Sequence, residues 1–278
     1  MRVIPAWGKL TERESYEMFN RLHRAAREGI RAGLPIPSDR TVSPPYLQLV
    51  DGGLSISDVD EFIDSLERWQ AASPANRFAA QWTATRALAN GGHLEALEEP
   101  LQRLAALTPE LDSVWATRSM HELNGTVARV RGDWAGAAHS YGAFVEAGDG
   151  ILRGWFDLVA AWWLLTARCL SEEQAVITGD ELREPWRCYR EQQIEVLQHH
   201  GITATALALQ RLGHVNLADR FIAWEHANDP AGVMTWAGFG GFLKIAGLPT
   251  ADVKNDDDLD SLLAELFAVA DELDRSNT

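Results

Sequence analysis

The sequence predicts an all-α fold, a right-handed α-solenoid of helical hairpins with an N-terminal helical extension and a C-terminal capping helix. Three observations support this prediction. From Ser57 onward, apolar residues recur at helical spacing in almost every segment. Breaks at Gly92, Gly132 and Gly213 are separated by 40 and 81 residues, close to one and two periods of 40. Eleven tryptophans supply large rings of the kind that pack between stacked helices.

The first 56 residues are expected to form one helix followed by a Pro-rich linker or ordered loop. Thr11 and Glu14 have capping-box spacing, and Gly33 ends a helix over residues 12–32. Four prolines between positions 35 and 45 exclude regular helix from the loop, which continues to Gly53.

Residues 57–229 are predicted to form the helical repeats, and residues 230–278 a helical cap. A break near residue 172 would complete the 40-residue series, and residues 171–173 are suited to start a helix there. Because an open solenoid leaves an apolar face in water, a final amphipathic helix over 259–273, behind the acidic run 256–258, is expected to cover one end. The other expected helices span 58–72, 73–90, a segment carrying Leu94, Leu97, Leu101 and Leu104, then 113–131, 134–146, 152–170, 180–200, 203–212 and 216–228.

The clearest hairpin lies within residues 125–144. Gly132 and Asp133 are suited to end one helix and to cap the next, because glycine tolerates a left-handed backbone and an aspartate accepts free N–H groups. Small residues stand where the two helices approach, at Gly125 and Ala137. The second helix then has an aromatic face, formed by Trp134, Tyr141 and Phe144.

Residues 116–144 resemble a tetratricopeptide-type repeat. Small, turn and aromatic residues stand where that family expects them, at Gly125, Gly132, Asp133, Trp134, Ala137 and Tyr141. Asn124 replaces the usual leucine, and Phe144 replaces a small residue. A weaker unit surrounds Gly213, with Ala206, Val215 and Ala218 in the matching places.

Residues 189–229 are also similar to the C-terminal repeat region of large actinobacterial ATPase/LuxR-type signalling regulators. The similar positions are Leu209, Leu212, Gly213, Ala218 and Ala223. The chain has neither the GxxxxGK[ST] loop nor the basic recognition helix of those proteins. The resemblance therefore implies the scaffold part alone, as a separate protein or as a fragment.

Charge and cysteine content restrict the partners and the compartment. The formal net charge is −15, which repels phosphate backbones and anionic lipid, so direct nucleic-acid or membrane binding is disfavoured. Cys169 and Cys188 have no neighbours at metal-ligand spacing, so we expect two buried thiols in a reduced, cytoplasmic protein. No run of apolar residues reaches the length of a membrane span.

No pattern in the sequence predicts a catalytic, metal or cofactor site. The pair His121-Glu122 begins like a zinc-hydrolase motif, but Gly125 stands where the second histidine belongs, so both residues are expected on the helix surface or facing a groove. The glycines at 238–241 lack the third glycine of a dinucleotide loop. The remaining histidines lack ligand spacing on one helix face: His199, His200, His214 and His226.

We therefore predict a non-enzymatic, regulatory interaction scaffold that binds a partner peptide or helix in a helical-repeat groove. Its oligomeric state is not predicted. A small-molecule sensor with an aromatic cavity near Trp155, Trp162 and Trp163 is the alternative, and an enzyme with an unfamiliar active site is the third. The predicted partner-binding residues are Arg118, His121, Asn124, Arg131, Trp162 and Trp163.

Overall fold

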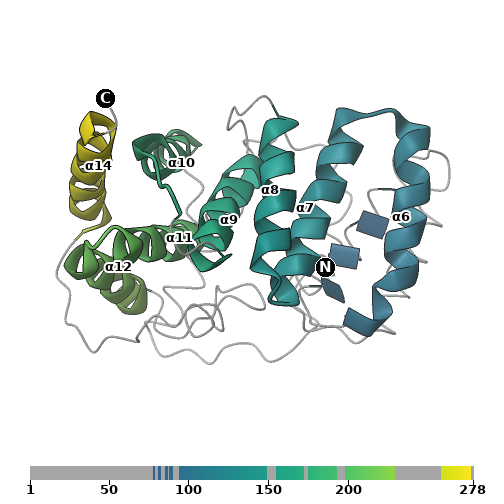
Figure 1. Cartoon of the computed structure of the whole chain (residues 1–278), viewed down its shortest axis with the longest axis horizontal. Helices are drawn as coiled ribbons and strands as arrows, with labels where there is room; N and C mark the ends of the chain where they lie inside the picture. The colour runs from purple at the N-terminus through teal and green to yellow at the C-terminus, as the bar shows by residue number, and fades with distance from the viewer. Residues whose placement is uncertain are drawn as a thin grey trace, which may run out of the picture. The chain divides into compact units, whose positions relative to one another are not determined.

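The computed structural model describes residues 94–148, 155–171, 175–192, 198–228 and 258–276, with a few positions between 78 and 89. Within them the chain forms helices and no strands, which confirms the all-α class (Figure 1). The described residues belong to two compact units, one before residue 149 and one from residue 155. The predicted N-terminal helix and loop, the helix over 58–72, the glycine-rich segment at 238 and the boundaries at 56 and 229 lie outside the described residues.

From residue 94 on, the described part of the earlier unit contains a 3-10 helix and three α-helices packed in chain order. The helix η1 spans Leu94–Ala96, and α6 (Glu98–Leu111), α7 (Val114–Val130) and α8 (Trp134–Glu146) follow. The predicted leucine stripe faces the core: Leu97 and Leu104 are buried, and Leu94 and Leu101 pack against the same cluster. It does not lie on a single helix as predicted, because Leu94 belongs to η1 and α6 begins only at Glu98. The bounds of α8 are those that the sequence predicts.

The turn between α7 and α8 forms as predicted. Gly132 has a φ of 75°, and the amides of Gly132 and Asp133 donate to the carbonyls of Arg129 and Ala128, the two bonds of a Schellman motif. The Asp133 carboxylate accepts the amide of Gly136 at 2.9 Å and so caps α8.

Three residues ahead of η1 contact α7 at a nearly constant separation along the chain. The rings of Phe78 and Trp115 have centroids 5.2 Å apart. The Trp82 indole donates to the Ser119 carbonyl at 2.9 Å, and Arg86 pairs with Glu122 at 2.8 Å. The contacts thus join residues 36 or 37 positions apart in the same order along both segments, as between two parallel elements.

The described residues of the later unit form five helices, of which α11 is the most enclosed. These helices are α9 (Trp155–Ser171), α10 (Gly179–Gln192), α11 (Gln198–Arg211), α12 (Val215–Asn228) and α14 (Leu259–Ser276). Residues 201–209 are all buried, because α11 packs against α9, α10 and α12. A Cβ atom on Gly201 would lie 2.6 Å from the Trp162 ring and 2.7 Å from the Trp186 ring, so glycine permits the close approach.

The turn between α11 and α12 repeats that of α7 and α8. Gly213 has a φ of 85°, its amide donates to the Gln210 carbonyl, and the His214 amide donates to the Leu209 carbonyl. Both hairpins therefore close through the same Schellman motif, with glycine in the left-handed position.

Two predicted helix boundaries are wrong. The break expected near residue 172 is present, because α9 ends at Ser171, but the helix start expected there is wrong: residues 175–178 are not helical and α10 begins at Gly179. The boundary predicted between the helices over 180–200 and 203–212 is displaced, because α10 ends at Gln192 and α11 begins at Gln198, so residues 201 and 202 lie inside α11. The sequence between them has no glycine or proline, so its pattern contains no stop signal.

Candidate helix-binding face

The predicted partner-binding residues of α7 differ in accessibility. Arg118 is half-buried: its Nε donates to the Phe144 carbonyl at 3.2 Å, and its guanidinium lies 4.1 Å from the centroid of the Phe144 ring. Arg118 therefore stabilises the end of α8. His121 is half-buried, whereas Asn124 and Arg131 are exposed.

Glu122 is buried, not on the helix surface as one of the two expected placements had it. Its Oε1 accepts from Arg86 at 2.8 Å and from the Thr126 hydroxyl at 3.2 Å, while no hydrogen bond reaches its Oε2 from the described residues. The Tyr141 hydroxyl joins the same cluster, 3.2 Å from Thr126. Burial raises the pKa of Tyr141, and the nearby Arg129 opposes this shift.

Trp162 and Trp163 both lie inside the later unit. Trp162 is 2% exposed and contacts the rings of Trp186 and Tyr189, with centroids 5.2 and 6.2 Å away. Trp163 is 5% exposed and meets the His200 ring edge-on at 5.8 Å. Their surroundings give both tryptophans a packing role. His200 lies in the first turn of α11, whereas the sequence pattern places it at a helix end.

The amphipathic helix α14 packs against α10 and α12 (Figure 1). Its apolar stripe is buried, and a Cβ atom on Gly179 of α10 would lie 2.4 Å from the Ala270 carbonyl oxygen, so the two backbones are in close contact. The residues of this stripe are Leu262, Leu263, Leu266, Val269 and Ala270.

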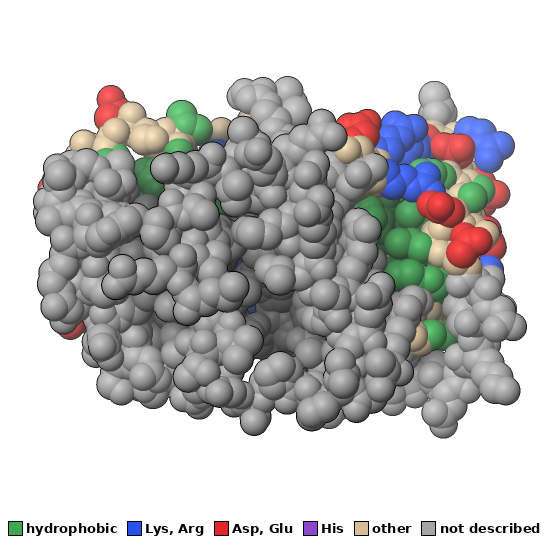
Figure 2. All heavy atoms as spheres, turned by 180° about the vertical axis from the view of Figure 1, so that it is seen from behind, with side chains coloured by type: hydrophobic (Ala, Val, Ile, Leu, Met, Phe, Trp, Pro, Cys, Tyr) green, Lys and Arg blue, Asp and Glu red, His purple; other side chains and the backbone are tan. Residues whose placement is uncertain are grey.

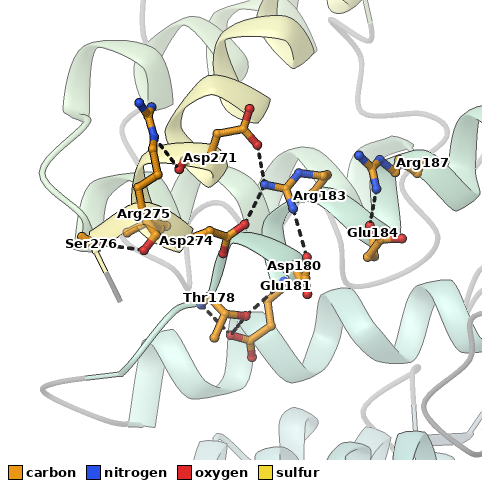
Figure 3. A network of polar contacts seen from close by, with 11 residues as sticks. Thr178, Asp180, Glu181, Arg183, Glu184, Arg187, Asp271, Asp274, Arg275 and Ser276 are labelled. Carbon is orange, nitrogen blue, oxygen red and sulfur yellow. Dashed lines mark hydrogen bonds and ion pairs between the residues drawn. The ribbon is translucent and has the colours of Figure 1, made fainter. Parts of the chain in front are cut away.

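Arg183 of α10 is the central polar contact to α14 (Figure 3). Its guanidinium donates to Asp271 at 2.6 Å and to Asp274 at 2.9 Å, and it also bonds Asp180 of its own helix at 3.0 Å. The hydrogen bond that Arg183 donates to Asp274 is the main cause that raises the pKa of Arg183, so this buried side chain stays charged.

Two further arginines hold the rest of α14. Arg190 of α10 pairs with Asp260 at 2.5 Å and lies 5.7 Å from the Phe267 ring centroid. Arg220 of α12 bonds both carboxylate oxygens of Glu265, at 2.7 and 2.8 Å. Seen from behind, acidic and basic side chains are interspersed where α14 lies (Figure 2, right). We use the name α10–α12 face for the surface of α10 and α12 that α14 covers; it comprises Arg183, Arg190, Arg220 and the apolar area under the stripe of α14.

Local interactions orient Arg183. Thr178 and Glu181 form a capping box at the start of α10: the Thr178 amide donates to Glu181 at 2.8 Å, and the Glu181 amide donates to the Thr178 hydroxyl at 3.2 Å. Arg168 of α9 also contacts Glu181. Because these contacts hold the first turn of α10 against α9, the backbone that carries Arg183 has a fixed position relative to α9.

Sequence reasoning missed the three arginines of the α10–α12 face. One signal could have pointed to them, since the acidic residues of α14 flank its apolar stripe at positions 260, 265, 271 and 274. An apolar stripe bordered by carboxylates implies basic side chains on the surface beneath it. Which basic residues these are depends on contacts between residues that are 45 to 91 positions apart in the sequence.

The described residues contain no group of His, Cys, Asp and Glu placed to hold a metal ion. Cys169 and Cys188 are buried, as predicted. Burial, with nearby acidic residues, raises the pKa of Cys188 to about 11, so its thiol stays protonated near neutral pH.

No helix in the described part is both long and apolar enough to cross a membrane. Comparisons with protein-family models, curated proteins and solved structures find no match to this chain.

Proposed function

We propose that this protein is a non-enzymatic, regulatory interaction scaffold that binds a helix or peptide of a partner protein. The docking of α14 supports the proposal most directly. It places an amphipathic helix on the α10–α12 face, with its apolar stripe buried and its carboxylates on three arginines. Helix-in-groove recognition uses the same combination of apolar anchors and flanking charges.

We further propose that the hairpins are tetratricopeptide-like repeats of a right-handed solenoid. In the earlier unit, the contacts of residues 78, 82 and 86 with α7 recur 36 or 37 residues further along. In the later unit, Trp163 of α9 contacts His200 of α11, again 37 residues further along. A helix packed on the helix after next, at a near-constant spacing, is what stacked hairpins produce.

The partner is expected to be a protein and not a nucleic acid or a membrane. The net charge of −15 opposes binding to phosphate backbones and anionic lipid. Asn124 and Arg131 are exposed on and just after α7, so they remain the predicted contacts of the earlier unit.

Capture of partners from a lysate of the source cells tests the scaffold function. The full-length protein is tagged, bound proteins are cross-linked, and the cross-links are mapped. We expect one protein in near-stoichiometric amount, with cross-links on α7 or on α10 and α12. The variant Asn124→Arg/Arg131→Glu changes only exposed side chains and tests the α7 contact, and Arg103→Gln on α6 is the control. No reproducible partner, or cross-links away from both faces, would contradict the proposal.

A further inference from the structure

We propose that the α10–α12 face binds an acidic amphipathic helix of a partner protein, and that α14 is the internal competitor of this helix. The inference rests on the proposed scaffold function and specifies the chemistry of the partner. It starts from the occupant that the face already holds, because α14 displays the pattern that a competing helix must match.

The contact of α14 with its unit is one-sided. The apolar stripe from Leu262 to Ala270 is buried, while Ala264, Ala268 and Glu272 on the other side are exposed. A helix that buries one face only can be replaced by another helix with the same stripe, because the other elements of the unit pack on one another without it. The contacts of α11 with α9, α10 and α12 do not involve α14.

The carboxylates of α14 remain largely in water although they form ion pairs. The side chains of Asp260 and Asp271 are 84% and 64% exposed, and that of Glu265 is 50% exposed. Ion pairs of this kind add little to affinity, but they determine which charge is accepted and speed up encounter. The apolar stripe therefore supplies most of the binding energy of α14, and the arginines select an acidic helix.

Charge complementarity determines the sign of the partner. Arg183 has only 9% of its side chain exposed and is surrounded by three aspartates, so without α14 two of its three carboxylate partners are absent. A nearly buried guanidinium requires such partners. A basic helix supplies none, whereas an acidic helix with the spacing of α14 restores both.

A competing α14 makes binding dependent on its release. The apparent dissociation constant of a partner helix is the intrinsic one divided by the fraction of protein in which α14 is detached. Any change that weakens α14 within the chain therefore strengthens binding of a helix supplied from outside. This reciprocal behaviour separates competition from simple packing.

The test uses full-length protein and a fluorescent synthetic peptide of residues 258–276, with binding measured by anisotropy. The host Leu263→Ala/Leu266→Ala carries a weakened α14 and should bind the peptide at least tenfold more tightly than wild type. Circular dichroism checks that this host is folded. A second host, Asp271→Asn/Asp274→Asn, creates no cavity and should bind about threefold more tightly than wild type.

Variant peptides test the charge selection in the leucine host. Glu265 and Glu272 are both exposed, but only Glu265 forms an ion pair with α12. The peptide with Glu265→Gln should bind at least threefold more weakly, and the matched control with Glu272→Gln should bind within twofold of the original. Adding Arg220→Glu to the host should weaken binding of the original peptide tenfold, and the Glu265→Arg peptide should restore it.

Equal binding of the peptide to the wild-type and both weakened hosts would overturn the inference, as would equal binding of a peptide with lysine at positions 260, 265, 271 and 274. This failure differs from failure of the scaffold function. A partner captured through α7 alone would support the scaffold function but contradict the proposed competition with α14. Tight peptide binding without any captured partner would support the competition with α14 but contradict the scaffold function.

Discussion

The two hairpins α7–α8 and α11–α12 close through the same turn but obtain their stability from different places. In α7–α8 the close approach at the glycine of the first helix is internal: a Cβ atom on Gly125 would lie 2.8 Å from the Tyr141 ring of α8. In α11–α12 the glycine of the first helix lies at a different position and contacts other helices, since Gly201 packs against tryptophans of α9 and α10. A shared turn motif therefore does not imply a shared core.

The difference follows from the neighbours of the first helix in each hairpin. α7 has a polar cluster around the buried Glu122 and exposes Asn124 nearby. α11 has no such exposed position between residues 201 and 209, where every residue is buried. Small residues in this stretch allow helices to approach from several sides, and Thr205 accepts the Trp186 indole N–H at 2.8 Å.

The largest expected effect is that of Trp186→Ala, which removes the ring on which α11 depends. Trp186 is fully buried against Trp162, Tyr189 and Phe221. We expect a loss of about 4 kcal/mol in the free energy of unfolding. Hydrogen-exchange mass spectrometry should show lost protection in α11 and α12, with α7 and α8 unchanged. An equal loss of protection in both hairpins would contradict the conclusion that they obtain their stability from different places.

The next effect concerns Gly125, whose counterpart 81 residues later is Ala206. Gly125→Ala places a methyl group against the Tyr141 ring, and we expect a loss of about 1.5 kcal/mol after the gain in helix propensity. The residue that corresponds to Tyr141 is Ile222, so Tyr141→Ile in the same chain should relieve the clash.

A double-mutant cycle by urea unfolding measures this coupling. The double variant Gly125→Ala/Tyr141→Ile should be about 1 kcal/mol more stable than the sum of the single effects predicts. Ala135→Gly, at an exposed position of α8, is the control for helix propensity alone. Additive effects would mean that the tyrosine ring does not set the requirement for glycine.

Alkaline pH should weaken the later unit first. The pKa of Cys188 is raised from 9.0 to about 11 by burial, so between these values the unfolded chain releases a proton that the folded chain retains. The unfolded state then binds fewer protons, and stability falls as pH rises. Allowing for solvent screening, we expect the loss to be about 1 kcal/mol between pH 9 and 11.

Guanidinium unfolding of wild type and Cys188→Ala across this range isolates the thiol, because the other alkaline groups are common to both proteins. As the pH rises from 9 to 11, the free energy of unfolding of wild type should fall relative to that of Cys188→Ala. In the earlier unit, Tyr141 has a pKa raised above 10.0, so its contribution has the same sign but begins at higher pH. A pH-independent difference would contradict the assignment to Cys188.

The smallest effect is expected at the helix caps, where the capping residue of one hairpin can be introduced into the other. Asp133 caps α8, and His214 occupies the corresponding position before α12. Asp133→Ala should cost about 1 kcal/mol, and His214→Asp should add up to about 1 kcal/mol by supplying an N-cap. Thermal unfolding measures both, with Asp133→Asn as a control that keeps an acceptor. A destabilising His214→Asp would show that the half-buried imidazole makes contacts that matter more than a cap.

Much of the local structure could be predicted from the sequence. The turns at Gly132 and Gly213, the Asp133 cap, the core-facing placement of the four leucines at 94–104 and the amphipathic final helix all form as expected. Each depends on residues a few positions apart. The break between Gln192 and Gln198 was missed because no residue there opposes a helix, so the packing of Gly201 against two tryptophans is needed to account for where α11 lies.

Sequence by itself determined the helical class, the two turns and the acidic, apolar-striped character of α14, since backbone preference and helical periodicity are local properties. Only the tertiary structure decided which charged residues act together. Arg183 joins aspartates 88 and 91 residues away, and Glu122 is buried beside Arg86, 36 residues before it. Such pairs follow from helix packing, because burial removes water from a charge and leaves it dependent on whichever side chain the neighbouring helix presents.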